Sequence, residues 1–217
     1  MRIVLLGAPG AGKGTQCKRI AARYGLAHLS SGDILRQQRA AGTELGRKAQ
    51  GFMDSGGLVS DDIMVEMMAG AISKASGAGF VLDGFPRTVN QARELDRTLA
   101  GNGEEIDVVL NLIIEDQVVL KRMSGRRSCP KCGAVYHTTN LKPRVEGVCD
   151  NDGAELVQRP DDSPHVVANR LKTYHAQTEL VVDYYRAHNT VYDIDAGGNV
   201  DATGVLVFEK LDTLIRA

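Results

Sequence analysis

The chain has 217 residues, a formal net charge of -1 and a pI of about 6.5, so it can bury a sizeable core but lacks the basic charge typical of nucleic-acid-binding proteins. Its first apolar run, residues 3–6, is far shorter than a signal-peptide core, and no stretch approaches the roughly 18 apolar residues that span a bilayer; we expect a soluble cytoplasmic protein without a membrane partner. In a reducing cytosol its four cysteines are expected to be metal ligands, catalysts or buried thiols rather than disulfides.

The first predicted element is a short strand that runs into a glycine-rich loop. Residues 3–6 are apolar and partly β-branched, which is typical of a strand buried on both faces of a parallel sheet. The glycines of the following GAPGAGKGT segment let backbone N–H groups converge on an anion, and the next helix adds its positive N-terminal end. We therefore predict a P-loop whose lysine reaches the outer phosphates of a nucleoside triphosphate. Its ATP-binding residues are Gly10, Ala11, Gly12, Lys13, Gly14 and Thr15.

Gly14 stands where the general P-loop motif has the serine or threonine that binds Mg²⁺, and Thr15 follows it. The metal must then be held differently. This favours enzymes in which Mg²⁺ lies mainly among phosphates and waters, and it argues against an ordinary GTPase or motor ATPase. The structural alternative is a glycine-rich turn with a chance lysine, but strand, loop, lysine and helix all agree with a P-loop.

A helix is predicted over residues 13–24, with Gly25 at its end. Cys17 lies on its apolar stripe and is expected to be a buried thiol. A short second strand follows at residues 26–29. We expect its His28 to be packed against neighbours rather than to act as a ligand.

Polar residues 30–33 (SSGD) then supply hydroxyl and carboxylate caps for another helix. Helical sequence continues from residue 43 to residue 76, with a break at residues 55–57. A new cap at residues 60–62 precedes the second part.

Three further apolar runs, at residues 80–83, 108–114 and 191–194, repeat the buried-strand pattern. Helical stretches lie between them, and strands that alternate with helices imply a parallel sheet covered on both faces. We predict an α/β fold, a P-loop three-layer sandwich with a five-stranded parallel sheet, whose ligand crevice lies at the carboxyl ends of the strands. The run at 80–83 ends in Asp83, as the Mg²⁺-side strand of P-loop enzymes does.

The pattern changes between residues 128 and 160, where helical periodicity stops and cysteines, prolines and glycines take over. We interpret this segment as an inserted lobe. Helix returns with Ser163 as a cap and Pro164 in the first turn. Its apolar face is expected to contain Val167, Leu171, Tyr174, Leu180 and Tyr184.

The lobe contains two pairs of possible ligands with the spacing of metal knuckles, separated by sixteen residues. The four predicted ligands are Cys129, Cys132, Cys149 and Asp152. Three thiolates and one carboxylate suit tetrahedral Zn²⁺ and leave no open position for catalysis, so we predict a structural zinc site. Asp150 and His137 are alternative fourth ligands, and a metal-free lobe with free thiols is the other alternative.

The chain resembles the adenylate kinase family at many separated points. The shared motifs are the GAPGAGKGT loop, LSSGD at 29–33, LVSD at 58–61, DGFPRT at 83–88, GRR at 125–127, the cysteine lobe of the zinc-lid type and RPDD at 159–162. The resemblance implies reversible phosphoryl transfer from MgATP to AMP, giving two ADP, by a monomer that serves adenine nucleotide homeostasis and binds no nucleic acid. Such a transfer needs a site that neutralises spread negative charge and aligns donor with acceptor.

The resemblance also implies roles for individual residues. The catalytic cations would be Lys13, Arg87, Arg122, Arg126, Arg159 and Arg170. The ATP site would add Arg122, Val135, Tyr136 and a backbone contact at Gly198. The AMP site would contain Ser30, Arg36, Gly57, Leu58, Val59, Gly84, Phe85, Pro86, Arg87, Gln91, Arg159 and Arg170. Gln91 would read the adenine edge, and Asp33 and Asp83 would hold the waters of Mg²⁺, with a helix cap or strand-end hydrogen bond as the alternative for each acid.

Arg122 and Arg126 stand four residues apart on a predicted helix, where like charges repel by roughly 0.2–0.5 kcal/mol. We therefore expect an anion between them, with two solvated surface arginines as the alternative. In domain terms, the resemblance implies a lid at residues 126–161 that closes over ATP and excludes water. It also implies an AMP-binding insertion at 30–59 and a core made of 1–29, 60–125 and 162–217.

Two functions of other classes compete with this interpretation. A regulatory P-loop ATPase or GTPase switch would need the hydroxyl that Gly14 replaces. A zinc-ribbon nucleic-acid adaptor would need a basic, aromatic lobe, whereas Cys149 is followed by two acids within residues 150–152.

Overall fold

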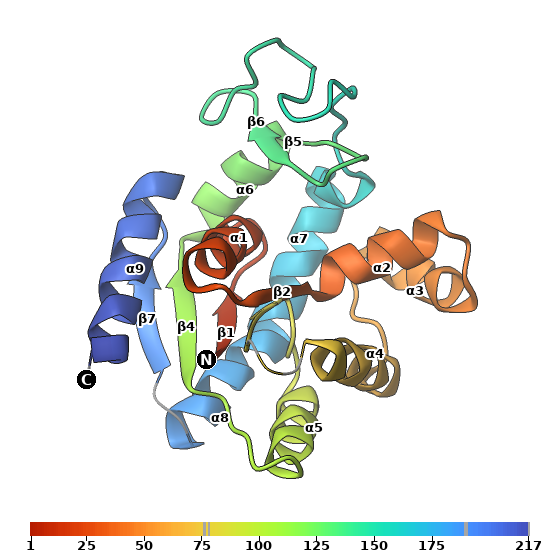
Figure 1. Cartoon of the computed structure of the whole chain (residues 1–217). Coiled ribbons are helices and arrows are strands. Elements are labelled where there is room, and N and C mark those ends of the chain that lie inside the picture. Colours follow the sequence, from red (N-terminus) through yellow and green to blue (C-terminus); the bar gives the residue numbers. More distant parts are fainter. Residues whose placement is uncertain (76, 78, 189–190, 217) are drawn as a thin grey trace.

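Five parallel strands form the centre of the computed structural model, which describes residues 1–75, 77, 79–188 and 191–216. The strands are β1 (Arg2–Gly7), β2 (Ala27–Ser30), β3 (Phe80–Asp83), β4 (Val108–Ile113) and β7 (Val191–Asp195). They lie in the order β2-β3-β1-β4-β7, with the P-loop strand β1 in the middle (Figure 1). Each neighbouring pair is parallel. The predicted α/β fold with a five-stranded parallel sheet is confirmed.

Successive residues of a strand point to opposite faces of the sheet. The strands are apolar at consecutive positions, so both faces of the sheet are apolar. In β1, Val4 and Leu6 belong to one buried cluster and Ile3 and Leu5 to the other. Helices α4, α5 and α8 contribute to the first cluster, and α1 and α9 to the second. The core helices are α1 (Lys13–Tyr24), α4 (Asp61–Lys74), α5 (Val89–Ala100), α6 (Asp116–Gly125), α7 (Pro164–Thr173), α8 (Glu179–His188) and α9 (Val200–Arg216). Among the described residues, no helix has the length and apolar character needed to cross a membrane.

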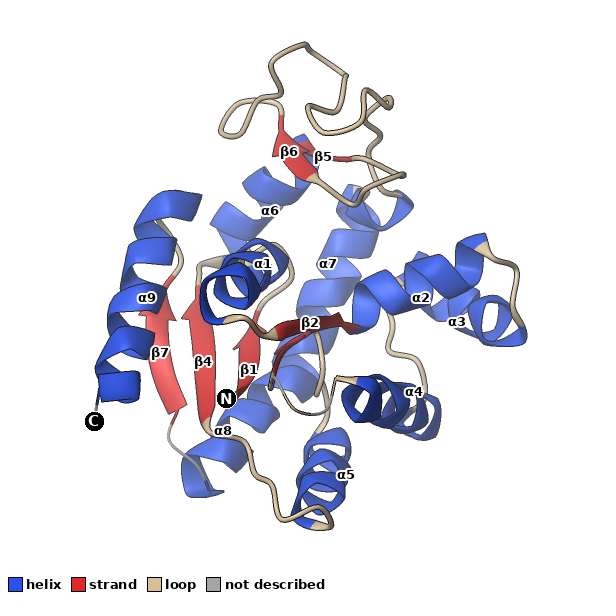
Figure 2. Ribbon diagram, in the orientation of Figure 1, coloured by secondary structure: helices blue, strands red, loops and turns tan. Residues whose placement is uncertain are grey.

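Two groups of elements lie outside this sandwich (Figure 1). One is the helix pair α2 (Ser31–Ala40) and α3 (Glu44–Ser55), which follows β2. The other is a lobe made mostly of loops, at the top of Figure 2, in which β5 (Arg126–Ser128) pairs antiparallel with β6 (Val135–His137). The short helix η1 (Pro160–Asp162) leads from the lobe back to the core. The sequence analysis missed the β5–β6 pair, because strands of three residues carry too little periodicity to detect.

The C-terminal helical segment departs from its predicted pattern after α7. A π-helical turn, η2 (Tyr174–Thr178), separates α7 from α8. Because this turn is wider than an α-helical one, it shifts the apolar stripe: Val181, Val182 and Tyr185 are buried, whereas Leu180 is 53% exposed. The prediction that Leu180 lies on the buried face is therefore wrong, since it assumed one continuous period of 3.6 residues.

The predicted N-terminal caps differ in whether the capping side chain makes a hydrogen bond. Ser30 caps α2 by accepting a hydrogen bond from the backbone N–H of Asp33 (3.3 Å). Ser60 and Ser163 occupy the N-cap positions of α4 and α7, but neither side chain makes a capping hydrogen bond. The helical stretch predicted to reach Ser76 ends at Lys74, and Ser76 itself lies outside the described residues.

Gly46, in the first turn of α3, allows α3 to pack closely on α2. A Cβ added to Gly46 would lie 2.3 Å from the carbonyl oxygen of Gln38. We therefore expect Gly46→Ala to lower the free energy of unfolding by roughly 1–3 kcal/mol through overpacking, measured by urea denaturation.

Gly51 in the same helix provides the control, because a Cβ there meets nothing within 4 Å. Gly51→Ala should raise the free energy of unfolding by roughly 0.5–1 kcal/mol, since glycine is a poor helix former. Two substitutions with the same effect on stability would contradict the packing argument at Gly46.

Candidate functional site

The loop between β1 and α1 has a backbone conformation that glycine permits. Gly10 and Gly12 have φ angles of 78° and 98°, in the left-handed region that other residues rarely adopt. Lys13 Nζ donates hydrogen bonds to the carbonyl oxygens of Gly7 (2.6 Å) and Ala8 (2.8 Å). The ammonium group therefore lies over the loop beside the N-terminal end of α1, where both favour a bound anion.

The carboxylate of Asp83 lies close to Gly14, the residue that stands in place of the usual serine or threonine. A Cβ at Gly14 would lie 3.0 Å from Asp83 Oδ2, so a larger residue would crowd the end of β3. Burial alone would raise the pKa of Asp83, but His28, whose Nε2 lies 3.7 Å away, and Lys13 hold it below its ordinary value. Asp83 is therefore a carboxylate at the mouth of the loop. Cys17 is fully buried behind it, as predicted.

A cavity of about 520 Å³ lies between the loop, α2 and the lobe. The predicted ATP residues that line it are Gly10, Ala11, Gly12, Lys13, Gly14, Thr15, Arg122, Val135, Tyr136 and Gly198. The predicted AMP and metal residues that line it are Ser30, Asp33, Arg36, Asp83, Gly84, Arg87, Arg159 and Arg170, and Arg126 also faces it. Residues predicted for two different nucleotides thus surround one space.

Two arginines of this cavity are held against polar groups of the lobe and of η1. Arg159 Nε donates a hydrogen bond to Ser128 Oγ (2.9 Å), and Arg170 makes an ion pair with Asp161 (2.6 Å). Burial and nearby guanidinium groups lower the pKa of Arg159 and of Arg170 to about 10. Both side chains remain protonated at neutral pH, so the cavity concentrates positive charge.

Arg122 and Arg126 are not arranged as predicted. Helix α6 ends at Gly125, so Arg126 begins β5 and the two arginines do not share a helix. Arg126 donates to both carboxylate oxygens of Asp162, while Arg122 donates to the carbonyl oxygen of Ala196 (2.7 Å). The expected repulsion between the pair along one helix is therefore wrong, although both side chains line the cavity.

A smaller pocket of about 70 Å³ lies among α2, α3 and α5 and adjoins the cavity. The predicted AMP residues that line it are Arg36, Gly57, Leu58, Val59, Arg87, Gln91 and Arg170. Arg36, Arg87 and Arg170 line both spaces, so the arginines stand between them. Phe85 lines neither, because it is buried in the hydrophobic core, whereas Pro86 lines a third space of about 60 Å³ beside Lys13.

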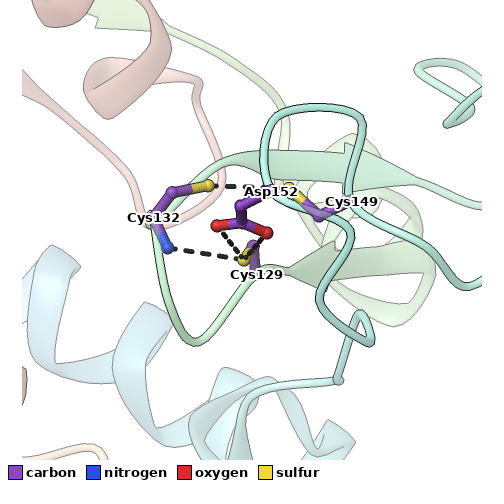
Figure 3. A group of neighbouring side chains, drawn as sticks. All are labelled: Cys129, Cys132, Cys149 and Asp152. Atoms are coloured by element: carbon purple, nitrogen blue, oxygen red, sulfur yellow. Dashed lines mark hydrogen bonds between the residues drawn. The ribbon is translucent and has the colours of Figure 1, made fainter.

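The lobe brings together the four predicted metal ligands Cys129, Cys132, Cys149 and Asp152, whose ligand atoms all lie within 4.8 Å of one another (Figure 3). Cys132 Sγ lies 3.5 Å from Cys149 Sγ, and Cys129 Sγ lies 3.4 Å from both oxygens of Asp152. Zn–S bonds of about 2.3 Å and Zn–O bonds of about 2.0 Å imply ligand separations of roughly 3.5–3.8 Å in a tetrahedron. The donor set and its spacing therefore fit Zn²⁺.

The two alternative fourth ligands have other partners. Asp150 Oδ1 accepts a hydrogen bond from the backbone N–H of Arg144 (2.9 Å). His137 Nδ1 accepts one from the backbone N–H of Thr139 (3.1 Å). Neither residue belongs to the ligand cluster found among the described residues, so Asp152 is the fourth ligand that the geometry favours.

The two halves of the cluster are built alike, which the sequence analysis overlooked. CPKCGA at residues 129–134 and CDNDGA at residues 149–154 share the pattern Cys-x₂-ligand-Gly-Ala. In each, the backbone N–H of the cysteine donates to the alanine carbonyl, and the glycine N–H donates back to the cysteine carbonyl, at 2.8–3.1 Å. Two matching turns thus present two ligands each.

Two other motifs contain acids whose partners were not predicted. Asp161 and Asp162, in the RPDD motif, form ion pairs with the cavity arginines. Asp61, in the LVSD motif, accepts hydrogen bonds from Thr88 and Gln91. No short-range signal in the sequence reveals these partners, because each contact joins segments that are distant along the chain.

Comparison with known proteins finds the family that the sequence motifs resemble. A family model described as adenylate kinase matches residues 5–190. Three similar proteins, each named adenylate kinase, come from Caldicellulosiruptor bescii (51% identical, 86% of this chain and 87% of that protein), Lachnospira eligens (46%, covering 93% and 95%) and Kosmotoga olearia (45%, covering 99% and 100%).

The pKa of Lys13 would link nucleotide affinity to pH if this lysine binds phosphate as predicted. Burial lowers its pKa to about 8, whereas bound phosphates favour the ammonium form and raise that pKa. Binding of ATP should therefore take up protons on Lys13, and the contribution of Lys13 to the affinity should be constant below about pH 7 and fall as the pH rises through 8. Calorimetric titration at pH 8.5, in buffers of different ionisation enthalpy, measures this uptake directly.

Lys13→Arg is the control, because its guanidinium stays protonated across this range. It should show less proton uptake than the unsubstituted protein. Equal uptake by both proteins at pH 8.5 would contradict the assignment to Lys13.

Proposed function

Because the chain belongs to the adenylate kinase family and, as an enzyme of that family, catalyses reversible phosphoryl transfer between ATP and AMP, we propose that the 520 Å³ cavity and the adjoining 70 Å³ pocket seat its two nucleotides. The observation that carries this proposal is the shared lining of arginines between a P-loop and a second pocket. Two phosphate chains that meet at this lining would be neutralised together and aligned for transfer.

ATP would bind along the P-loop side of the cavity. Its phosphates would lie over the loop N–H groups and Lys13, in place of the carbonyl contacts that Lys13 makes with the loop. Its adenine would lie between the lobe residues Val135 and Tyr136 and the loop at Gly198. Members of the family use Mg²⁺ with ATP; when bound, the ion neutralises phosphate charge, and Asp33 and Asp83 line the cavity where they can hold its waters.

AMP would bind in the smaller pocket, with its phosphate toward the arginines and its base toward Gln91. Arg36, Arg87 and Arg170 line both spaces, so they can bind the acceptor phosphate and face the transferred group. Arg122, Arg126 and Arg159 would complete the charge around that group. Phe85 supports this pocket from the core rather than by contact.

The lobe would act as a lid stiffened by a structural zinc ion. Its buried cluster contains only Cys129, Tyr136, Cys149 and Leu156, too little apolar surface to hold a fold of this length. Four protein ligands would fill a tetrahedral site and leave no position for a reactive water. The metal would therefore stabilise the lid, while the lid excludes water from the transferring phosphoryl group.

The same proposal covers the organisation and setting of the protein. The core would consist of residues 1–29, 60–125 and 162–217, with an AMP-binding insertion at 30–59 and the lid at 126–161. The protein would act as a cytoplasmic monomer in adenine nucleotide homeostasis, with no nucleic-acid or membrane partner. A net charge of -1 supports the absence of a nucleic-acid partner.

The test of the two-nucleotide assignment is a coupled assay of ADP formation from MgATP with each monophosphate in turn. AMP should be strongly preferred, and a dinucleotide in which two adenosines are joined by a phosphate chain should bind far more tightly than ATP or AMP alone. Comparable kcat/KM values for CMP, UMP or GMP, or steady hydrolysis of ATP without a monophosphate, would contradict the assignment.

Arg87 offers a specific test of the arginine lining. Arg87→Ala should reduce kcat/KM by roughly 10³-fold or more, as loss of an arginine on a transferring phosphoryl group does, while the melting temperature changes little. Arg93→Ala, on an exposed part of the next helix, should keep full activity. Arg87→Ala with normal turnover, or with loss of the fold, would contradict the role.

Zinc removal tests the lid. Chelation should lower the melting temperature, yet Mg²⁺-dependent transfer should persist at temperatures at which the metal-free protein stays folded. Asp152→Cys should retain zinc, and Asp152→Ala should weaken its binding by more than about tenfold.

Asp150→Ala is the matched control, because its carboxylate lies outside the cluster, and it should leave zinc affinity unchanged. Metal content, melting temperature and activity are measured on the same samples. Chelated protein that is fully folded but inactive would overturn the structural role, and freshly purified protein without zinc would overturn the site.

A further inference from the structure

Asp61 accepts several hydrogen bonds although it lines neither the large cavity nor the smaller pocket. It lies at the first residue of α4, and all its partners come from the start of α5. Its Oδ2 accepts hydrogen bonds from Thr88 Oγ1 (2.9 Å) and Asn90 Nδ2 (3.1 Å), and its Oδ1 accepts one from Gln91 Nε2 (2.8 Å). The carboxylate therefore contacts directly the side chain proposed to read the base of AMP.

The Gln91 amide is fixed at both of its ends. Gln91 is 1% exposed and lines the smaller pocket. Its Oε1 accepts a hydrogen bond from the backbone N–H of Arg87 (2.8 Å) while its Nε2 donates to Asp61. A carboxylate only accepts and a backbone N–H only donates, so one orientation of the amide satisfies both partners. The reversed orientation would set oxygen against oxygen and N–H against N–H in a buried place, which is strongly unfavourable.

This orientation determines what the amide can offer to a ligand. An amide oxygen has two lone pairs and an amide nitrogen has two hydrogens, and Arg87 and Asp61 use one of each. One acceptor and one donor therefore remain, and they cannot exchange places. Adenine presents an amino donor beside a ring-nitrogen acceptor, which matches this pair. A 6-oxopurine has a carbonyl oxygen in place of the amino group, so it would require the reversed amide.

We propose that Asp61 is a positioning residue that fixes the Gln91 amide in one orientation and thereby makes the enzyme select 6-aminopurine over 6-oxopurine monophosphates. The inference rests on the proposed placement of AMP in the smaller pocket. Asp61 acts through Gln91 and does not touch the nucleotide. The contact of Asp61 with Thr88 supports this role, because the Thr88 hydroxyl also caps α5 by accepting a hydrogen bond from the backbone N–H of Gln91 (3.1 Å).

Asp61→Asn tests the proposal with nearly unchanged shape. The asparagine amide can turn either group toward Gln91, so only the backbone N–H of Arg87 then opposes the reversed orientation. AMP and IMP are the probes, because they have the same size and differ at position 6 of the purine. We expect the ratio of kcat/KM for AMP to that for IMP to fall about tenfold, through a change in KM for the monophosphates, with KM for ATP unchanged.

Two variants control for general effects on this region. Asp62→Asn removes an exposed acid from the same helix turn, and Asn90→Ala removes a partner of Asp61 other than Gln91. Both should keep the AMP:IMP ratio of the unsubstituted enzyme. If Asp61→Asn does not yield folded protein, Asp61→Ser serves in its place, because its shorter side chain withdraws the acceptor from Gln91 Nε2, and the same fall in the ratio is expected.

The possible outcomes distinguish the role of Asp61 from the proposed reading of the base by Gln91. Folded Asp61→Asn with an unchanged AMP:IMP ratio would overturn the role of Asp61, and so would a loss of stability without a change in selectivity. An unsubstituted enzyme that uses IMP as readily as AMP would instead overturn the proposed reading of the base by Gln91. A tenfold fall in the ratio confined to Asp61 variants would support both.

Discussion

Repulsion among arginines gathered around one cavity is the constraint on which much of this structure depends. Guanidinium groups placed close together in a partly dry space must be balanced, because an uncompensated buried charge destabilises a protein by several kcal/mol. The balance comes from two acids of η1: Asp161 pairs with Arg170, and Asp162, whose side chain is fully buried, pairs with Arg126. These pairs also orient the arginines, which the proposed binding of phosphate groups requires.

The ion pair of Arg126 and Asp162 has a second consequence, because it joins the two ends of the lobe. Arg126 begins β5, where the chain leaves α6, and Asp162 ends η1, where the chain returns to α7. The Arg126–Asp162 ion pair therefore closes the base of the lobe, whereas the tip of the lobe depends on the cysteine cluster and on a hydrophobic cluster of four buried residues. A further contact, from Lys18 Nζ to the carbonyl oxygen of Gly133 (3.1 Å), links the first metal knuckle to the helix that follows the P-loop.

Those parts of the structure that depend on neighbouring residues were predictable from the sequence. The strand at residues 3–6, the helix over 13–24 and the two turns that carry the predicted metal ligands all follow from local spacing, and the structure contains each of them. Contacts between distant segments were not predictable. The helix predicted to hold Arg126 ends one residue earlier, and the pair formed by Asp61 and Gln91 joins residues thirty positions apart. The family resemblance named the residues around the cavity, but it did not say which acid holds which arginine.

The π-helical turn between α7 and α8 constrains the number of residues that this segment can contain. Val167 and Leu171 of α7 pack in a cluster beneath the lobe, whereas Val181 and Tyr185 of α8 pack in the main core. The two helices can pack in these two clusters because the turn at 174–178 rotates the side chains of α8 relative to those of α7. Each residue of an α-helix advances the side-chain direction by about 100°, so removing a single residue from this turn would swing Tyr185 out of the core. Surface loops accept insertions and deletions readily. The turn at 174–178 has no such freedom, although most of its residues are not buried, because its length sets which face of α8 meets the core.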